Sequence, residues 1–355
     1  MPRTLKLPLV VCALAALLPL CAPEARARQA APDTQFEHGV ALYRRGDVKG
    51  AVREFRAVVK RRQDDPLAWV YLGQALARRG ELKDARKALD AALKLDPGYA
   101  RAHSSLAYVH VVSGKDGAAE AAAAQAIALD PKLTDAHYVL GLLRLRQGAW
   151  PRALEEADAI IKLDPKVTGA YLLKAQALLG LFDSASMILA EGGRGAHDHD
   201  EAAVGERRVA RTQWLREASE SLAEYLRLRP DAEDADRLRE DLAALRFYAE
   251  ASSSADPARK VYTASDGVSR AVLLAKPEPG FTEDGRRAGV NGTVRLRAVL
   301  GADGTVKHIL VLRRLGHGLT EKAVAAARQI KFKPATLAGQ PVSQYVVLEY
   351  NFNVY

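Results

Sequence analysis

Cysteine is nearly absent from this chain of 355 residues: Cys12 and Cys21 are the only two, and both lie close to the N-terminus. The same region places basic residues ahead of an apolar run from Leu7 to Leu20, which is the pattern of an export signal. We therefore predict a signal peptide over residues 1–27. Its removal would leave a mature chain without a thiol, which excludes disulfides, catalytic cysteines and cysteine-ligated metals.

A long hydrophobic run is also lacking. A membrane-spanning helix needs about 20 consecutive apolar residues, and the N-terminal run is shorter, with Pro8 and Pro19 near its ends. Two alternatives to cleavage remain: retention as a membrane anchor, and lipid attachment at Cys21, which the large Leu20 before it disfavours. We expect a location in the periplasm or cell envelope, with an inner-membrane-anchored chain as the alternative.

Motifs of known catalytic chemistry are missing too. The sequence shows no Gly-rich phosphate loop, no HExxH pair and no Ser, His and Asp in a recognisable order. Its eight histidines are mostly isolated: His103, His110 and His137 fall within expected helices, and His308 and His317 on an expected strand and loop. We predict that the protein is not an enzyme and uses no cofactor.

The net charge of +9 is unevenly placed. Residues 258–355 hold 15 Lys and Arg against 7 Asp and Glu, whereas residues 28–257 hold 34 against 35. In an exported protein a basic C-terminal part favours acidic peptides or anionic lipid headgroups as partners rather than nucleic acid. A merely solubilising surface explains the charge equally well.

A repeat is present instead. Asp-Pro recurs with prolines at positions 66, 97, 131 and 165, at intervals of 31, 34 and 34 residues, which indicates a repeat architecture. The other recurring positions are Trp69, Leu72, Gly73, Leu76, Gly80, Ala85 and Leu89 in one copy, and Leu140, Gly141, Gly148, Ala153 and Ala157 in another. This pattern resembles the tetratricopeptide repeat, in which small residues stand where two antiparallel helices cross and proline stops the second helix.

The resemblance implies an α-helical solenoid over residues 32–251, with about five helix pairs and a capping helix after Pro230. The repeats are expected at about 32–65, 66–99, 100–133, 134–167 and 168–230.

The fifth repeat is expected to be split by an insertion, residues 182–211, forming a solvated loop. Within it, His197-Asp-His199-Asp could ligate a divalent metal. A polar loop explains the same residues, and we predict no metal site.

In the family, inner helices of such a stack line a concave groove that holds extended peptides or partner helices. The positions that match this register are Phe36, Tyr43, Arg44, Gln74, Arg78, Tyr108, Tyr138 and Arg146. Aromatic rings and guanidinium groups could grip a peptide there. Packing between helices is the alternative role for each of them.

The pattern changes after a small, polar stretch, residues 252–262, which we interpret as a linker. In residues 292–300, GTVRLRAVL, apolar residues alternate with Arg295 and Arg297, so we expect a strand with one buried and one charged face. Asp303-Gly304 predicts a hairpin to a return strand. A helix with Thr320 as its N-cap then runs to about Ile330, and a last strand spans residues 342–352.

The resulting β-β-α-β order over residues 263–355 predicts an antiparallel sheet covered by one helix. The residues that match a known pattern are Lys276, Pro279, Gly289, Gly292, Gly304, Gly318, Leu319, Phe332, Pro334, Gly339 and Pro341. Together they resemble the C-terminal domain of the TonB family. The predicted fold class of the whole chain is thus an α-solenoid followed by a small α+β domain.

In that family the domain adds an extended segment of an outer-membrane transporter as a strand beside its last strand. The residues that the resemblance places at this edge and its approach are Val342, Tyr345, Val347, Glu349, Asn351, Phe352, Gly339 and Pro341. Four basic residues would steer an acidic peptide or would only solubilise the domain: Arg286, Arg287, Arg313 and Arg314.

We interpret the whole as a non-enzymatic adaptor whose groove binds one protein or peptide of the cell envelope and whose last strand captures another. One alternative is a TonB-type energy transducer for outer-membrane transporters, which would need the leader as an inner-membrane anchor. A second is a homodimer formed through the last strand. Peripheral association with the inner or outer membrane is compatible with each of them.

Overall fold

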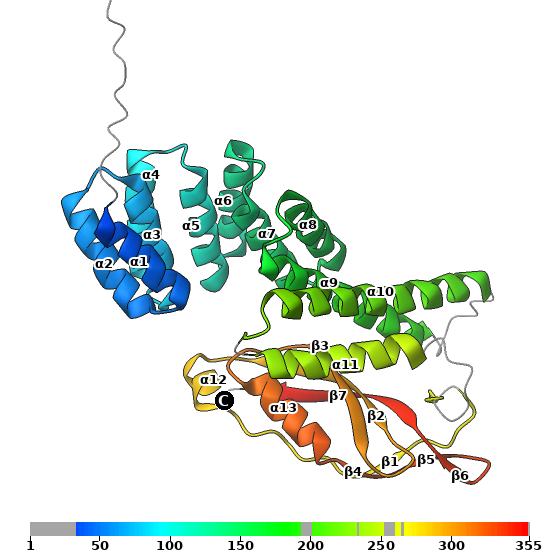
Figure 1. Ribbon diagram of the computed structural model, residues 1–355. Helices are drawn as coiled ribbons and strands as arrows, with labels where there is room; N and C mark the ends of the chain where they lie inside the picture. The colour runs from blue at the N-terminus through cyan, green and yellow to red at the C-terminus, as the bar shows by residue number, and fades with distance from the viewer. Residues whose placement is uncertain (1–32, 193–200, 233, 252–259, 264–265, 354–355) are drawn as a thin grey trace, which may run out of the picture.

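The computed structural model describes residues 33–192, 201–232, 234–251, 260–263 and 266–353. A stack of helices leads into a mixed domain of strands and helices (Figure 1). The predicted signal peptide, the His197-to-Asp200 motif and most of the predicted linker lie outside the described residues. The predicted fold class, a helical solenoid followed by a small sheet domain, is confirmed.

Antiparallel helix pairs build the first part of the solenoid. Their bounds are α1 Thr34–Arg45, α2 Val48–Arg61, α3 Pro66–Arg78, α4 Leu82–Leu95, α5 Ala100–Val112, α6 Asp116–Leu129, α7 Thr134–Arg146 and α8 Trp150–Leu163.

Local sequence fixes where these helices begin and how closely they cross. Asp65 caps α3 by accepting hydrogen bonds from the amides of Leu67 and Ala68, and Pro66 suits the first turn because it has no amide to satisfy. At Gly73 a Cβ would lie 2.7 Å from Leu89 Cγ of α4. Only glycine therefore allows α3 and α4 to pack at this distance.

One hydrogen bond recurs at the start of successive repeats. In each case a side chain bonds the carbonyl six residues earlier, and the residues stand 34 apart: Trp69 with Gln63 at 2.9 Å, His103 with Pro97 at 2.9 Å, His137 with Pro131 at 3.3 Å, and Tyr171 with Pro165 at 3.1 Å. Because the carbonyl accepts, the ring nitrogen of each histidine donates. His103 and His137 thus hold the inter-repeat turn.

The expected loop over residues 182–211 is wrong for the described part of that range. Helix α9, Thr168–Gly192, runs straight through its start, and α10, Glu201–Leu228, begins well before its end. The physical reason is that the apolar pattern continues past Leu181, because Phe182 is buried against the α10 residue Leu215. The final solenoid helix is α11, Ala235–Ala251.

The C-terminal domain is built around three antiparallel strands in the order β3-β2-β7. Its elements are β1 Val272–Ala275, α12 Glu283–Arg287, β2 Gly292–Leu300, β3 Val306–Arg313, α13 Leu319–Arg328, β4 Lys331–Lys333, β5 Ala335–Leu337, β6 Gln340–Val342 and β7 Gln344–Phe352. Strands β1 and β4 pair as a separate antiparallel ribbon, and β5 and β6 form a short hairpin.

Two details of the predicted domain need correction. The residue at the N-cap of α13 is Gly318, and Thr320 lies inside the helix, where its hydroxyl donates to Leu315 O at 2.7 Å. The predicted last strand is interrupted, because Val342 belongs to the β5–β6 hairpin and β7 begins at Gln344.

The sheet is covered on both faces. On one face, Leu296, Leu348 and Tyr350 pack against Ala323 and Ala327 of α13. On the other, strand residues such as Val299 and Leu310 join a core with helix residues such as Leu245 and Tyr248 of α11. Helix α11 lies along the sheet between the strands and the rest of the solenoid (Figure 1). The expected charged, open face of β2 is therefore a buried contact between the two parts.

Within the described residues, no helix combines the length and the apolar character that crossing a bilayer requires.

Candidate partner-binding surfaces

Strand β7 has an open edge. It pairs with β2 along its whole length, from Gln344 to Phe352. On the opposite side Tyr345 N donates to Tyr262 O at 2.9 Å, and alternate residues of a strand direct their backbone groups to the same side. Val347, Glu349 and Asn351 thus present amides and carbonyls to that side, where no described strand continues the sheet.

The buried side chains of β7 hold this edge in place. The alternate residues Leu348, Tyr350 and Phe352 are buried in the domain core. Burial raises the pKa of the Tyr350 hydroxyl to about 12. On the other face Val347 is 45% exposed, and Glu349 and Asn351 are exposed as well. The core thus fixes the position of a strand whose residues Val347, Glu349 and Asn351 are exposed.

One side chain occupies part of the edge. Lys276 Nζ donates to Glu349 O at 2.7 Å and lies 4.5 Å from the centre of the Tyr350 ring. An incoming strand needs the same carbonyl, so Lys276 would have to move aside for strand addition.

The structure separates the other residues that the sequence assigned to this edge. Tyr345 turns toward the solenoid and packs 5.5 Å from the Tyr248 ring. Val342 and Pro341 pair with β5, and Gly339 takes the positive φ of 82° that the hairpin turn requires.

The predicted groove residues divide into two groups. Four of them make contacts between neighbouring helices: Phe36 packs on Phe55 and Tyr71, Gln74 donates to Ser105, Arg146 donates to Val111 O and pairs with Asp116, and Tyr138 lies against Gly169. The others are Tyr43, Arg44, Arg78 and Tyr108. Arg44, Arg78 and Tyr108 are exposed and Tyr43 is half-buried, but the separation is incomplete, because Arg78 also bonds a neighbouring helix and Arg146 is exposed as well.

Arg78 and Arg146 occupy equivalent positions two repeats apart. Each donates to the carbonyl 35 residues earlier, Tyr43 O for Arg78 and Val111 O for Arg146. These carbonyls lie near the C-terminal ends of α1 and α5, which are the first helices of the preceding repeats. A guanidinium group bonded there stabilises the end of the helix. Arg78 also lies 5.3 Å from the centre of the Tyr43 ring, and Tyr108 nearby is 38% exposed. These three side chains are the part of the predicted groove set that combines rings with a cation.

Comparison with known proteins agrees with both parts. The family model described as tetratricopeptide repeat matches residues 36–100, 75–134, 105–168 and 138–185. The model described as Gram-negative bacterial TonB protein C-terminal matches residues 277–354. The chain is a tetratricopeptide repeat protein with a TonB C-terminal domain. Among curated proteins, no match was found.

Several solved structures are similar to part of this tetratricopeptide repeat protein. MamA protein is 24% identical over 56% of this chain and 94% of its own, with a TM-score of 0.37. A thermophilic TPR protein of Thermus thermophilus, TTC0263, is 19% identical over 60% and 97%, with a TM-score of 0.45. The human IFIT1 dimer with m7Gppp-AAAA is 18% identical over 64% and 50%, with a TM-score of 0.50. The last of these likenesses shows the helical fold.

The interface between the repeats and the TonB domain, called the joint below, combines apolar packing with polar contacts that the sequence did not reveal. Arg297 of β2 lies 5.3 Å from the ring centres of Phe182 and Tyr248 and 4.6 Å from that of Tyr345. Tyr248 also donates its hydroxyl to His308 O at 2.9 Å. The alternating arginines of β2 were visible in the sequence, but their partners stand more than 45 residues away.

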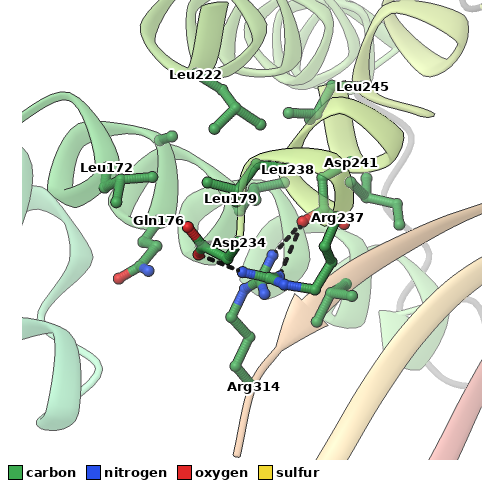
Figure 2. A pocket seen from close by; sticks show the side chains of 13 residues that line it. Leu172, Gln176, Leu179, Leu222, Asp234, Arg237, Leu238, Asp241, Leu245 and Arg314 are labelled. Atoms are coloured by element: carbon green, nitrogen blue, oxygen red, sulfur yellow. Dashed lines mark hydrogen bonds and ion pairs between the residues drawn. The ribbon is translucent and has the colours of Figure 1, made fainter. Parts of the chain in front are cut away.

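A buried carboxylate, that of Asp241, lies in another part of this joint (Figure 2). Asp241 of α11 accepts from Arg237 at 3.2 Å and also pairs with Arg314, which follows β3. Burial raises the pKa of Asp241 to about 7, although the Arg237 guanidinium group opposes that shift. Arg314 is therefore committed to the joint and is not the free steering charge that the sequence suggested.

The remaining predicted steering arginines stay at the surface. Arg286 and Arg313 are exposed, and Arg287 pairs with Glu283 at 3.2 Å.

Proposed function

We propose that this protein is a non-enzymatic adaptor of the bacterial cell envelope. Its TonB domain adds an extended segment of one partner to the open edge of β7, and its tetratricopeptide repeats bind a second protein. The observation that carries the proposal is the row of outward backbone groups at Val347, Glu349 and Asn351. Such an edge gives affinity through main-chain hydrogen bonds.

The solenoid contributes a second, different kind of surface. Tyr43, Arg78 and Tyr108 offer ring faces and one guanidinium group, which suit a peptide with apolar and acidic side chains. The exposed Arg44 lies next to Tyr43 in the sequence and adds a further positive charge.

The joint fixes the TonB domain relative to the solenoid, which affects how the two binding sites act together. Ion pairs and shared apolar packing hold the TonB domain against α9 and α11. Two linked sites raise each other's effective concentration when both can be engaged at once. Here a packed interface, and not a flexible tether, sets the distance between them.

The protein is proposed to act in the periplasm or at the envelope, with partners that include outer-membrane transporters. Retention in the inner membrane would favour a TonB-type transducer, and pairing through β7 would favour a homodimer. Fractionation of cells, with sequencing of the native N-terminus, tests whether the chain is retained in the inner membrane. Sedimentation of the purified chain tests whether it forms a homodimer.

A substitution at Val347 tests strand addition. Its amide points away from β2, so V347P removes a donor from the open edge and leaves the β2 ladder intact. V347A is the matched control because it shortens the same side chain and keeps the amide. Fluorescence anisotropy with a panel of extended heptapeptides from envelope proteins should find binding that V347A keeps and V347P loses. Equal binding by both variants contradicts strand addition.

A further inference from the structure

The β1–β4 ribbon exposes an unusual amount of apolar surface. Val272, Leu273 and Leu274 are consecutive and are 55%, 43% and 60% exposed. In the other described strands, Val347 is the one large apolar side chain that is comparably exposed. Contiguous apolar side chains left in solvent mark a contact surface.

Basic side chains lie beside these apolar residues. Val272 stands opposite Lys333 and Ala275 opposite Lys331 across the ribbon, so each pair lies on the same face. Arg270 precedes the strand and is exposed. Residues 270–276 and 331–337 contain no Asp or Glu. In the described part of the chain, none of Arg270, Lys331 and Lys333 forms an ion pair.

The position of the ribbon suits an external surface. Figure 1 shows β1 and β4 along the rim of the sheet domain away from the helical stack. The flanks of β1 lie close to β7, since Ala271 N donates to Gln344 Oε1 at 2.9 Å and Lys276 reaches Glu349 O. If a second surface bound this ribbon, the solenoid would point away from that surface.

We propose that the β1–β4 ribbon is a membrane-contact surface that recognises anionic lipid headgroups. Apolar side chains enter the interfacial layer of a bilayer, and adjacent Lys and Arg meet anionic headgroups. All four residues of β1 are exposed, whereas Phe332 of β4, which stands opposite Leu273, is buried in the domain core. The ribbon therefore rests on the domain through Phe332 and leaves the side chains of β1 and the two lysines of β4 free to meet a bilayer surface.

Vesicle flotation of the full chain tests the proposal. The probes are vesicles of phosphatidylcholine alone and of phosphatidylcholine with one-quarter phosphatidylglycerol. The protein should float with the anionic vesicles only. K331Q/K333Q should weaken the partition more than ten-fold, since each cation near an anionic surface contributes roughly five-fold. V272S/L274S should also weaken it, because the apolar contribution is lost.

Matched controls separate the ribbon from general basicity. K132Q/K166Q removes two exposed lysines of the solenoid, and L129S removes an apolar side chain that is 41% exposed on α6. Both should float like the unmodified chain. The proposal is wrong if either control variant loses as much vesicle binding as K331Q/K333Q. It is also wrong if the unmodified chain does not bind anionic vesicles.

A protein partner is distinguished in the same experiment. If the ribbon variants keep vesicle binding and lose capture of an acidic heptapeptide, the surface serves a peptide and the lipid proposal is wrong. Thermal melting by circular dichroism accompanies each variant. If V272S/L274S lowers the melting temperature, the conclusion rests on K331Q/K333Q alone, because that variant changes only exposed side-chain ammonium groups.

Discussion

Arg295 of β2 forms an ion pair with Asp183 of α9, with Nη1 3.0 Å from Oδ2 and both side chains 15% exposed. The two residues are 112 positions apart, and the pair joins the repeats to the TonB domain. Burial raises the pKa of Asp183, while the Arg295 charge opposes that shift. Removing one partner of such a pair leaves the other charge poorly solvated.

D183A should therefore lower the free energy of unfolding by about 2 kcal/mol, since among the described residues Arg295 keeps only the half-exposed Glu349 as an ionic partner, at 3.2 Å. The matched control is D158A, which removes the more exposed partner of Lys174 and should cost at most about 1 kcal/mol. Urea titration followed by circular dichroism measures both. Equal losses in the two variants would show that the joint is not held by this pair.

Asp241 should make the stability of the joint depend on pH. Its folded-state pKa of about 7 lies above the ordinary value of 3.8, so the folded protein holds the extra proton between about pH 4 and 7. The stabilisation from this group is thus fully present below pH 4 and is lost as the pH rises to 7. The charged groups around it are Arg237, Asp234 and Glu240 of the helical part and Arg314 of the TonB domain.

D241N removes that titration. The difference in unfolding free energy between the unmodified chain and D241N should fall by on the order of 3 kcal/mol from pH 4 to pH 8. The control D158N changes an exposed carboxylate and should show no such fall. Urea titrations at several pH values provide the measurement. If the difference in unfolding free energy stays constant or grows as the pH rises, Asp241 does not bind a proton in the folded protein as described.

Lys276 should limit access to β7. K276M removes the bond to Glu349 O and keeps an apolar chain beside Tyr350. Freeing this carbonyl should tighten peptide binding several-fold, because one competing hydrogen bond of about 1 kcal/mol is lost. K260M, beside Tyr262 at 4.9 Å, serves as the control and should leave binding unchanged. Weaker binding by K276M in anisotropy would mean that Lys276 contacts the peptide instead of blocking it.

Two glycines in the solenoid should respond in opposite ways to alanine. A Cβ at Gly141 would collide with Leu173 of the next repeat, whereas Gly117 on α6 has open space around it. G141A should cost about 1–3 kcal/mol through overpacking, and G117A should gain up to about 1 kcal/mol in helix propensity. Thermal melts measure both. A tolerated G141A would contradict the close approach of α7 and α9.

The contrast among these residues shows what the sequence could predict. The 34-residue period places Trp69, His103 and His137 because each repeats the same local contact. Alternation in β2 and β7 predicts strands for a similar reason. Contacts between distant segments leave no periodic pattern in the sequence. The ion pair between Asp183 and Arg295 could therefore not be predicted from it.

The structure adds contacts that the repeat register does not show. Arg78 and Arg146 match the groove register, and each also bonds a carbonyl near the end of the first helix of the preceding repeat. The apparent insertion in the fifth repeat is largely two long helices, because a lost repeat motif does not imply a lost helix.

The central claim, strand addition at β7, is tested most directly by amide hydrogen exchange measured by NMR with a bound heptapeptide. The amides of Val346, Leu348 and Tyr350 face β2 and should be protected with or without peptide. Those of Val347, Glu349 and Asn351 should exchange fast in the free protein and become protected on binding. Peptide binding that leaves these three amides unprotected would contradict the account.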